Sequence, residues 1–155
     1  MKTILAYGDS ITWGSSAIIG GPRHAYEDRW PSVLEAGLGG QARVIAEGLG
    51  GRTTAHDDWF ANADRNGARI LPTLLASHNP LDAVVIMLGT NDLKPFLGAS
   101  ALEASFGIRR LVQVIRGHAA MDAIRDVAGR LRIRTPRLNQ AEQFSSPRIT
   151  RIHAE

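Results

Sequence analysis

The sequence predicts an α/β fold built on a parallel sheet, and two observations predict it. Three short apolar runs alternate along the chain with three segments whose apolar residues recur at helical spacing, a pattern typical of helices packed around a parallel sheet. The third run, Ala83–Leu88, is apolar on both faces, as expected of a buried parallel strand. A length of 155 residues is enough for one domain with a core of its own.

The individual elements follow from the same patterns. The predicted strands are Thr3–Tyr7, Arg43–Ala46 and Ala83–Leu88. The predicted helices are Trp30–Leu38, Ala68–Ser77 and Ala101–Arg116. Pro31 is tolerated because it falls in the first turn of its helix. Helical spacing of apolar residues resumes after Arg116, but Pro136 and Pro147 interrupt it, and we expect no further apolar strand.

Charge divides the chain into two parts. Residues 1–115 hold 10 Lys or Arg and 11 Asp or Glu, whereas residues 116–155 hold 8 Arg and 4 acidic residues. We therefore expect a domain over residues 1–118 and an arginine-rich tail over residues 119–155. A basic tail can bind nucleic acid, but this one lacks the interleaved aromatic residues that stack on bases. A solvated helix face is the preferred interpretation, and no nucleic-acid partner is expected.

Composition bears on compartment, metals and membranes. The chain has no cysteine, which rules out disulfides and thiolate-bound metals. No group of His, Asp and Glu has the spacing of metal ligands, so we expect neither a metal nor a cofactor. Met1-Lys2 leads directly into a predicted strand with no apolar leader, and no stretch approaches the ~18 apolar residues of a membrane span. We expect a cytoplasmic protein with no membrane partner.

Three short motifs directly follow the three predicted strands. They are Gly8–Gly14, Glu47–Thr54 and Gly89–Asp92. Because the carboxyl ends of parallel strands meet at one edge of a sheet, the three loops should converge there. Ester hydrolysis needs a nucleophile and hydrogen-bond donors aimed at the developing oxyanion. Ser10 can attack, and the N–H groups of Ser10 and Gly51 and the side-chain amide of Asn91 can serve as donors.

In their order and spacing the three motifs resemble the first three blocks of the GDSL, or SGNH, hydrolase family. Four stretches are similar to the bacterial arylesterase and acyltransferase branch of that family: Arg29-Trp30, Glu47–Thr54, Asn66–Ala68 and Met87–Asp92. The resemblance covers residues 2–118. It implies a flavodoxin-like fold with α/β/α layers and a homo-oligomer that acts on small ester substrates. It also implies that Ser10 is the nucleophile and that Ser10, Gly51 and Asn91 form the oxyanion hole.

The chain departs from the family pattern in its last forty residues. The fourth block of the family is an Asp-x-x-His motif that provides the general base and its orienting carboxylate, and family members run on through two further strands. The nearest echo here is Thr150–His153, with threonine in place of aspartate. We therefore expect a C-terminally incomplete sheet and no Ser-His-Asp triad. Residues 119–155 are interpreted as a truncated, aberrant or frame-shifted tail.

These observations leave two functions open. The first is a serine esterase or acyltransferase that forms an acyl-enzyme on Ser10. The second is a catalytically silent pseudo-hydrolase that lacks its histidine–aspartate pair, because loss of the histidine alone can cost about 10⁶-fold in turnover. His153 is the candidate to replace the missing base.

Several other polar residues are interpreted as structural. Asp9 is expected to hydrogen-bond loop backbone and Asp92 to tie loops together, and helix capping is the alternative role of Asn91. Trp13 either lines an acyl pocket or covers the sheet edge. His118 is expected at a helix end. The remaining histidines before the tail are interpreted as loop or surface residues: His24, His56 and His78.

The incomplete sheet has a consequence for the third predicted strand. In the flavodoxin-like order the first strand lies between the second and the third, so Ala83–Leu88 becomes an edge although its composition is that of a central strand. Its unpaired backbone groups would then be a template for another chain. Arg132–Arg134 is the only candidate for a short covering strand.

Overall fold

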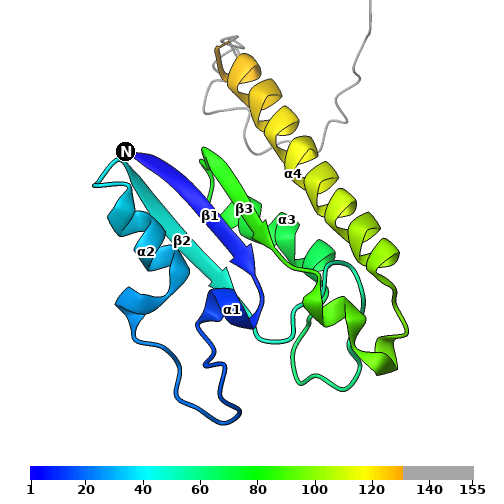
Figure 1. Cartoon of the computed structure of the whole chain (residues 1–155). Helices are drawn as coiled ribbons and strands as arrows, with labels where there is room; N and C mark the ends of the chain where they lie inside the picture. The colour runs from blue at the N-terminus through cyan, green and yellow to red at the C-terminus, as the bar shows by residue number, and fades with distance from the viewer. Residues whose placement is uncertain (131–155) are drawn as a thin grey trace, which may run out of the picture.

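The computed structural model describes residues 1–130 and contains a three-stranded parallel sheet. Its strands are β1 (Lys2–Gly8), β2 (Ala42–Gly48) and β3 (Ala83–Met87), arranged in the order β2-β1-β3 (Figure 1). Leu5 of β1 lies opposite Ile45 of β2 and Val84 of β3. The predicted parallel α/β class and the central position of the first strand are confirmed, and the predicted strands agree with the observed ones to within two residues at each end.

The connections between strands are helical, as the spacing of apolar residues predicted. The α-helices are α1 (Ser10–Trp13), α2 (Trp30–Gly37), α3 (Gly67–Ser77) and α4 (Ala101–Arg130), and the 3₁₀ turns are η1 (Tyr26–Asp28), η2 (Thr90–Leu93) and η3 (Pro95–Leu97). Within this described part of the chain, no helix combines the length and apolar character needed to cross a membrane.

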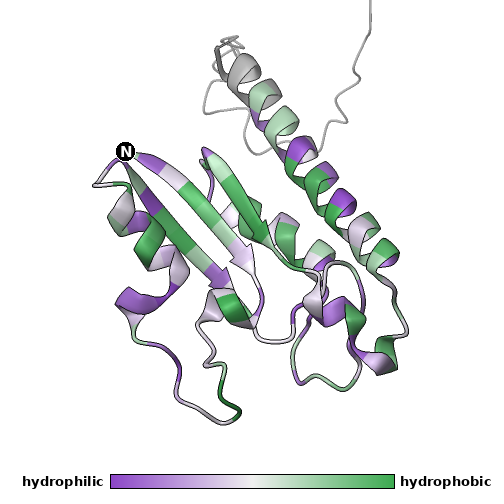
Figure 2. Ribbon diagram, viewed as in Figure 1, coloured by the Kyte–Doolittle hydropathy of each residue, from purple (hydrophilic) through white to green (hydrophobic). Residues whose placement is uncertain are grey.

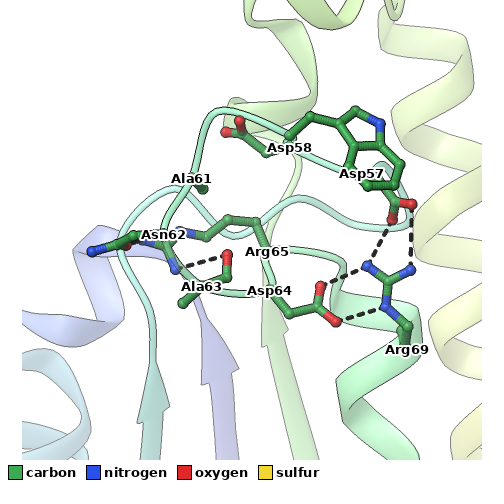
Figure 3. Close-up of a pocket in the computed structure, with 9 residues that line it drawn as sticks. Asp57, Asp58, Ala61, Asn62, Ala63, Asp64, Arg65 and Arg69 are labelled. Carbon is green, nitrogen blue, oxygen red and sulfur yellow. Dashed lines mark hydrogen bonds and ion pairs between the residues drawn. The ribbon is translucent and has the colours of Figure 1, made fainter.

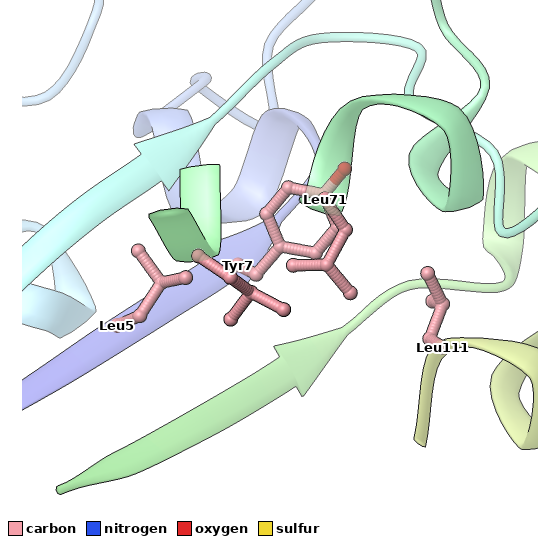
Figure 4. Packing of buried hydrophobic residues seen from close by; sticks show 5 residues of the cluster. Leu5, Tyr7, Leu71 and Leu111 are labelled. Atoms are coloured by element: carbon pink, nitrogen blue, oxygen red, sulfur yellow. The ribbon is translucent and has the colours of Figure 1, made fainter. Parts of the chain in front are cut away.

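The core lies between one face of the sheet and the helices α3 and α4. It is formed by buried residues of β1, α3 and α4 (Figure 4): Leu5, Tyr7, Leu71, Leu75 and Leu111. Side chains alternate between the faces of a strand, so Ala42 and Val44 point to the other face, where they are buried and where α2 packs on β2. Figure 2 shows β3 as mostly apolar, whereas β1, β2 and α4 carry both apolar and polar residues.

Helix α4 is longer than the sequence patterns predicted. The prediction ended it at Arg116 and placed His118 at a helix end; both are wrong, because α4 continues to Arg130. Gly117 does not end the helix, since it lacks the positive φ of a left-handed cap, and one interior glycine costs only about 1 kcal/mol. His118 Nε2 lies 3.2 Å from Asp122 Oδ2, one turn further along the helix.

Strand β3 is an edge strand within residues 1–130, as predicted. Its residues Val85 and Met87 are 36% and 39% exposed, although a strand of this composition is usually buried. The candidate covering stretch, Arg132–Arg134, lies outside the described residues. The division of the chain at residue 118 stays a prediction, and α4 runs through that position.

We predict that the amides of β3 exchange with solvent faster than those of β1, because within residues 1–130 β1 has a partner strand on both sides and β3 on one. Native-state hydrogen exchange measures both strands in one experiment. Strong protection of Ala83–Met87 in a monomer whose exchange does not depend on concentration would contradict the prediction. It would show that another segment of the chain completes the sheet.

Candidate active site

The first loop of the site begins where β1 ends. Asp9 caps α1, and its Oδ1 accepts the N–H of Ile11 at 3.0 Å, so the expectation that Asp9 binds loop backbone is confirmed. Ser10 is the first residue of α1 and is half-buried. Within residues 1–130, no hydrogen bond of the Ser10 hydroxyl is found, so no general base from this part of the chain contacts it.

One side-chain amide joins the three loops. Asn91 Nδ2 donates to the carbonyl oxygen of Arg52 at 3.1 Å and to Asp9 Oδ2 at 3.3 Å. The third motif is therefore bound to residues that directly adjoin Ser10 and Gly51. The alternative role of Asn91 as a helix cap is wrong, because Gly89 precedes η2 as its cap and no side chain caps it.

Gly51 adopts a conformation that a larger residue would strain. Its φ is +82°, in the left-handed region. A Cβ at this position would lie 3.3 Å from both Arg65 Nε and Lys94 Nζ, so two cationic side chains flank this loop. Lys94 Nζ also pairs with Asp58 at 2.7 Å, and this hydrogen bond lowers the pKa of the Asp58 carboxyl.

The buried guanidinium of Arg52 ties the carboxyl ends of two strands together. The residue is only 3% exposed. Its Nη1 donates to the carbonyl oxygen of Gly8 at 2.9 Å and also to that of Glu47. Its guanidinium carbon lies 4.2 Å from the centre of the Tyr7 ring, which is cation–π geometry. Sequence analysis missed this role, because an arginine in a loop gives no local sign that it is buried.

The Tyr7 side chain continues this network toward α3. Its hydroxyl donates to the carbonyl oxygen of Gly67 at 2.8 Å, at the first residue of the helix. Burial raises the pKa of the Tyr7 phenol to about 12, and the neighbouring Arg52 guanidinium opposes that rise. The same burial lowers the pKa of Arg52.

The Asp92 carboxylate is fully buried and binds the second loop. It accepts the backbone N–H of Thr54 at 3.0 Å, the Thr54 hydroxyl at 2.5 Å and His56 Nδ1 at 2.9 Å. The expected loop-tying role of Asp92 is confirmed. His56 is a loop residue, as interpreted, but its partnership with a carboxylate 36 positions away was missed, since no sequence pattern links the two.

The second loop also has its own ion-pair network. Figure 3 shows Arg69 of α3 between two carboxylates, with Nε 2.6 Å from Asp64 and Nη2 2.9 Å from Asp57. A cavity of about 330 Å³ lies over this network. The network links the loop that carries Gly51 and Arg52 to α3, although exposed pairs of this kind contribute little to stability.

Three further sequence interpretations concern the rim of the site. Trp13 is 39% exposed, and the guanidinium carbon of Arg23 lies 4.2 Å from its ring centre. Its two alternatives, an acyl pocket and a cover for the sheet edge, stay open. His153 lies outside the described residues. Residues 1–130 contain no group of three or more His, Asp or Glu that could hold a metal ion.

A parallel sheet whose carboxyl edge joins a serine, a glycine and an asparagine loop defines an SGNH-type hydrolase architecture. The chain belongs to the GDSL-like Lipase/Acylhydrolase family, whose model matches residues 6–152. This confirms the family that the motifs resembled. The match extends past residue 118, where the resemblance seen in the sequence ends. A comparison with curated proteins found no match.

Solved structures of bacterial esterases resemble the chain closely. A carbohydrate acetylesterase family member from Sinorhizobium meliloti is 61% identical, with a TM-score of 0.72 over 75% of this chain and 54% of that one. The native aryl esterase of M. smegmatis is 44% identical, with a TM-score of 0.70 over 74% and 54%. Another carbohydrate acetylesterase from S. meliloti is 43% identical, with a TM-score of 0.68 over 74% and 54%. The chain thus spans about half the length of these relatives.

We predict that the free energy of unfolding falls between about pH 10 and pH 12 and that Tyr7→Phe removes this fall. An unfolded tyrosine ionises near pH 10, whereas the pKa of folded Tyr7 is about 12. The unfolded state therefore loses its proton first, and stability declines by up to about 3 kcal/mol. Urea unfolding at several pH values measures the decline. Tyr26→Phe, at a residue 64% exposed, is the control; an equal decline in both variants would contradict the prediction.

Proposed function

We propose that the chain is a serine ester hydrolase or acyltransferase that acts on small carboxylic esters through an acyl-Ser10 intermediate. The observation that carries this proposal is the Asn91 amide, which binds Arg52 beside Gly51 and Asp9 beside Ser10. It holds the proposed nucleophile and the proposed donors at one edge of the sheet. Family membership supports the same reaction class.

In the proposed reaction, Ser10 Oγ attacks the carbonyl carbon of the ester and the carbonyl oxygen becomes an oxyanion. The N–H groups of Ser10 and Gly51 and the Asn91 amide donate to it. Asn91 uses both of its amide hydrogens in the resting structure. Its 3.3 Å contact with Asp9 is the longer of the two, and we infer that this bond is exchanged for the oxyanion.

The alcohol then leaves, and the acyl group stays on Ser10 until water or a second alcohol attacks it. Water gives hydrolysis and an alcohol gives acyl transfer. The similar proteins are called an aryl esterase and carbohydrate acetylesterases, which supports small acyl groups such as acetyl as substrates. The proton of Ser10 needs a base, and His153 remains the proposed candidate. Thr150 cannot give it the negative partner that aspartate gives in the family.

A second candidate function is a silent pseudo-hydrolase that binds small esters without turning them over. It is favoured by the Ser10 hydroxyl, which contacts no base among residues 1–130. The two functions differ widely in rate. Oxyanion donors and substrate binding alone leave roughly 10³–10⁴-fold acceleration over water, whereas loss of the histidine costs about 10⁶-fold in turnover.

We predict that Ser10→Ala removes covalent labelling of the protein by a fluorophosphonate, a reagent that phosphonylates nucleophilic serines, and lowers hydrolysis of a chromogenic acetyl ester. The reason is that Ser10 adjoins Asp9, whose carboxylate contacts the amide of the proposed oxyanion donor Asn91. Intact-protein mass spectrometry detects the label. Ser15→Ala, five residues away in the same loop, is the control and should keep both label and rate. If the wild-type chain is not labelled, the second candidate function, a silent pseudo-hydrolase, is the correct one.

We predict that Asn91→Ala lowers kcat for the same ester by about 10²-fold, because the loss of one oxyanion donor costs about 3 kcal/mol of transition-state stabilisation. Steady-state kinetics at saturating ester measure the effect. Asn62→Ala, in the exposed part of the second loop, should leave kcat unchanged. An unchanged kcat in Asn91→Ala would remove this residue from the site.

A further inference from the structure

We propose that His56, held by the buried Asp92 carboxylate, is a second nucleophile that cleaves activated aryl esters in a cavity separate from Ser10. The starting point is a histidine–carboxylate pair that the proposed Ser10 chemistry does not use. Asp92 is fully buried, and His56 Nδ1 lies 2.9 Å from its Oδ1.

The hydrogen bonds around Asp92 determine which nitrogen of His56 is free. The backbone N–H and hydroxyl of Thr54 both donate to Asp92, so its oxygens act as acceptors throughout. His56 Nδ1 must then carry the hydrogen that Asp92 accepts, which leaves the lone pair of a neutral ring on Nε2. Within the described part of the chain Nε2 has no hydrogen-bond partner, and the His56 side chain is 30% exposed.

A cavity of about 280 Å³ lies beside this imidazole. It is formed between the second loop and the first turns of α4 and is lined by Ala55, His56, Glu103, Phe106, Gly107 and Arg110. Its volume lies just below the range of about 300–1,000 Å³ that is usual for small-molecule sites. None of Ser10, Gly51 and Asn91 lines it. Helix α4 packs tightly against the second loop here, since a Cβ at Gly107 would clash with the Thr54 hydroxyl that binds Asp92.

The lining residues suit an aryl ester. Phe106 offers an aromatic wall, 50% exposed, for the aryl group. The Arg110 guanidinium lines the same cavity and offers a cation for the developing oxyanion. Glu103 adds a negative charge to the lining of the same cavity. Its carboxylate accepts the N–H of Ser100 at 2.6 Å, and this hydrogen bond lowers the pKa of the Glu103 carboxyl.

The proposed reaction needs only the ester and water. The Nε2 lone pair attacks the carbonyl carbon, the carbon–oxygen bond to the aryl group breaks, and the aryl oxide leaves with that electron pair. The acyl group is then bonded to Nε2, and the Nδ1 hydrogen remains in the bond to Asp92. Water attacks the acyl carbon, the carbon–nitrogen bond breaks and its electrons return to Nε2. The attacking water gives its second proton to the aryl oxide, so one carboxylic acid and one phenol result. Aryl oxides are stable leaving groups, whereas imidazole is too weak a nucleophile to expel an alkoxide readily.

The test uses the full chain with Ser10→Ala, so that its result does not depend on the proposed function of Ser10. The substrate is 4-nitrophenyl acetate. Adding His56→Gln should lower the remaining rate at least about tenfold, and adding His24→Gln instead should leave it unchanged, because the His24 ring makes no contact with a carboxylate in the described structure. Ethyl acetate should not be cleaved, because its alkoxide is too poor a leaving group for an imidazole nucleophile.

A chemical measurement covers the case in which His56→Gln does not fold. Diethyl pyrocarbonate acylates free imidazole nitrogens, so in the Ser10→Ala chain the loss of rate should parallel modification of the peptide that contains His56. Hydroxylamine should restore the rate. The inference is overturned if His56→Gln folds and keeps the rate of the Ser10→Ala chain, if His24→Gln lowers the rate equally, or if the rate survives full modification of His56.

Discussion

The candidate site depends on one buried cation. The Arg52 guanidinium is buried, and removing a charge from water costs free energy. Hydrogen bonds to two carbonyl groups and the contact with the Tyr7 ring offset that cost. The carbonyls belong to Gly8 and Glu47, at the carboxyl ends of β1 and β2. The loops that follow these strands therefore cannot separate without leaving a buried charge unsatisfied. The backbone carbonyl of the same residue binds Asn91, so one arginine fixes all three loops.

Asp92 gives the site its second anchor, and the two anchors act on adjacent residues. Asn91 holds the first and second loops through its amide, while Asp92 holds Thr54 and His56 through its carboxylate. The two neighbouring side chains of the short turn η2 thus point to different places. Asn91 faces the proposed Ser10 chemistry, and Asp92 faces His56 and the cavity beside α4. This division explains how a single loop can support two separate groups of reactive atoms.

Residues 1–130 leave one edge of the sheet, at β3, without a neighbouring strand. The chain spans about half the length of esterases that it resembles at up to 61% identity, and its β3 strand has a partner on one side only within the described residues. The anchors of the site, Tyr7, Arg52 and Asp92, lie on β1, the second loop and η2.

The sequence by itself determined the order of strands and helices along the chain, the three loops that carry Ser10, Gly51 and Asn91, and the hydrogen bonding of Asp9 to loop backbone. These features depend on local periodicity and on the rule that parallel strands end at a common edge. Only the tertiary structure decided that Arg52 is buried, that His56 pairs with Asp92, and that α4 passes Gly117 to reach Arg130. The physical reason is that burial and long-range pairing depend on which elements pack together, and local spacing carries no record of a partner that lies far along the chain.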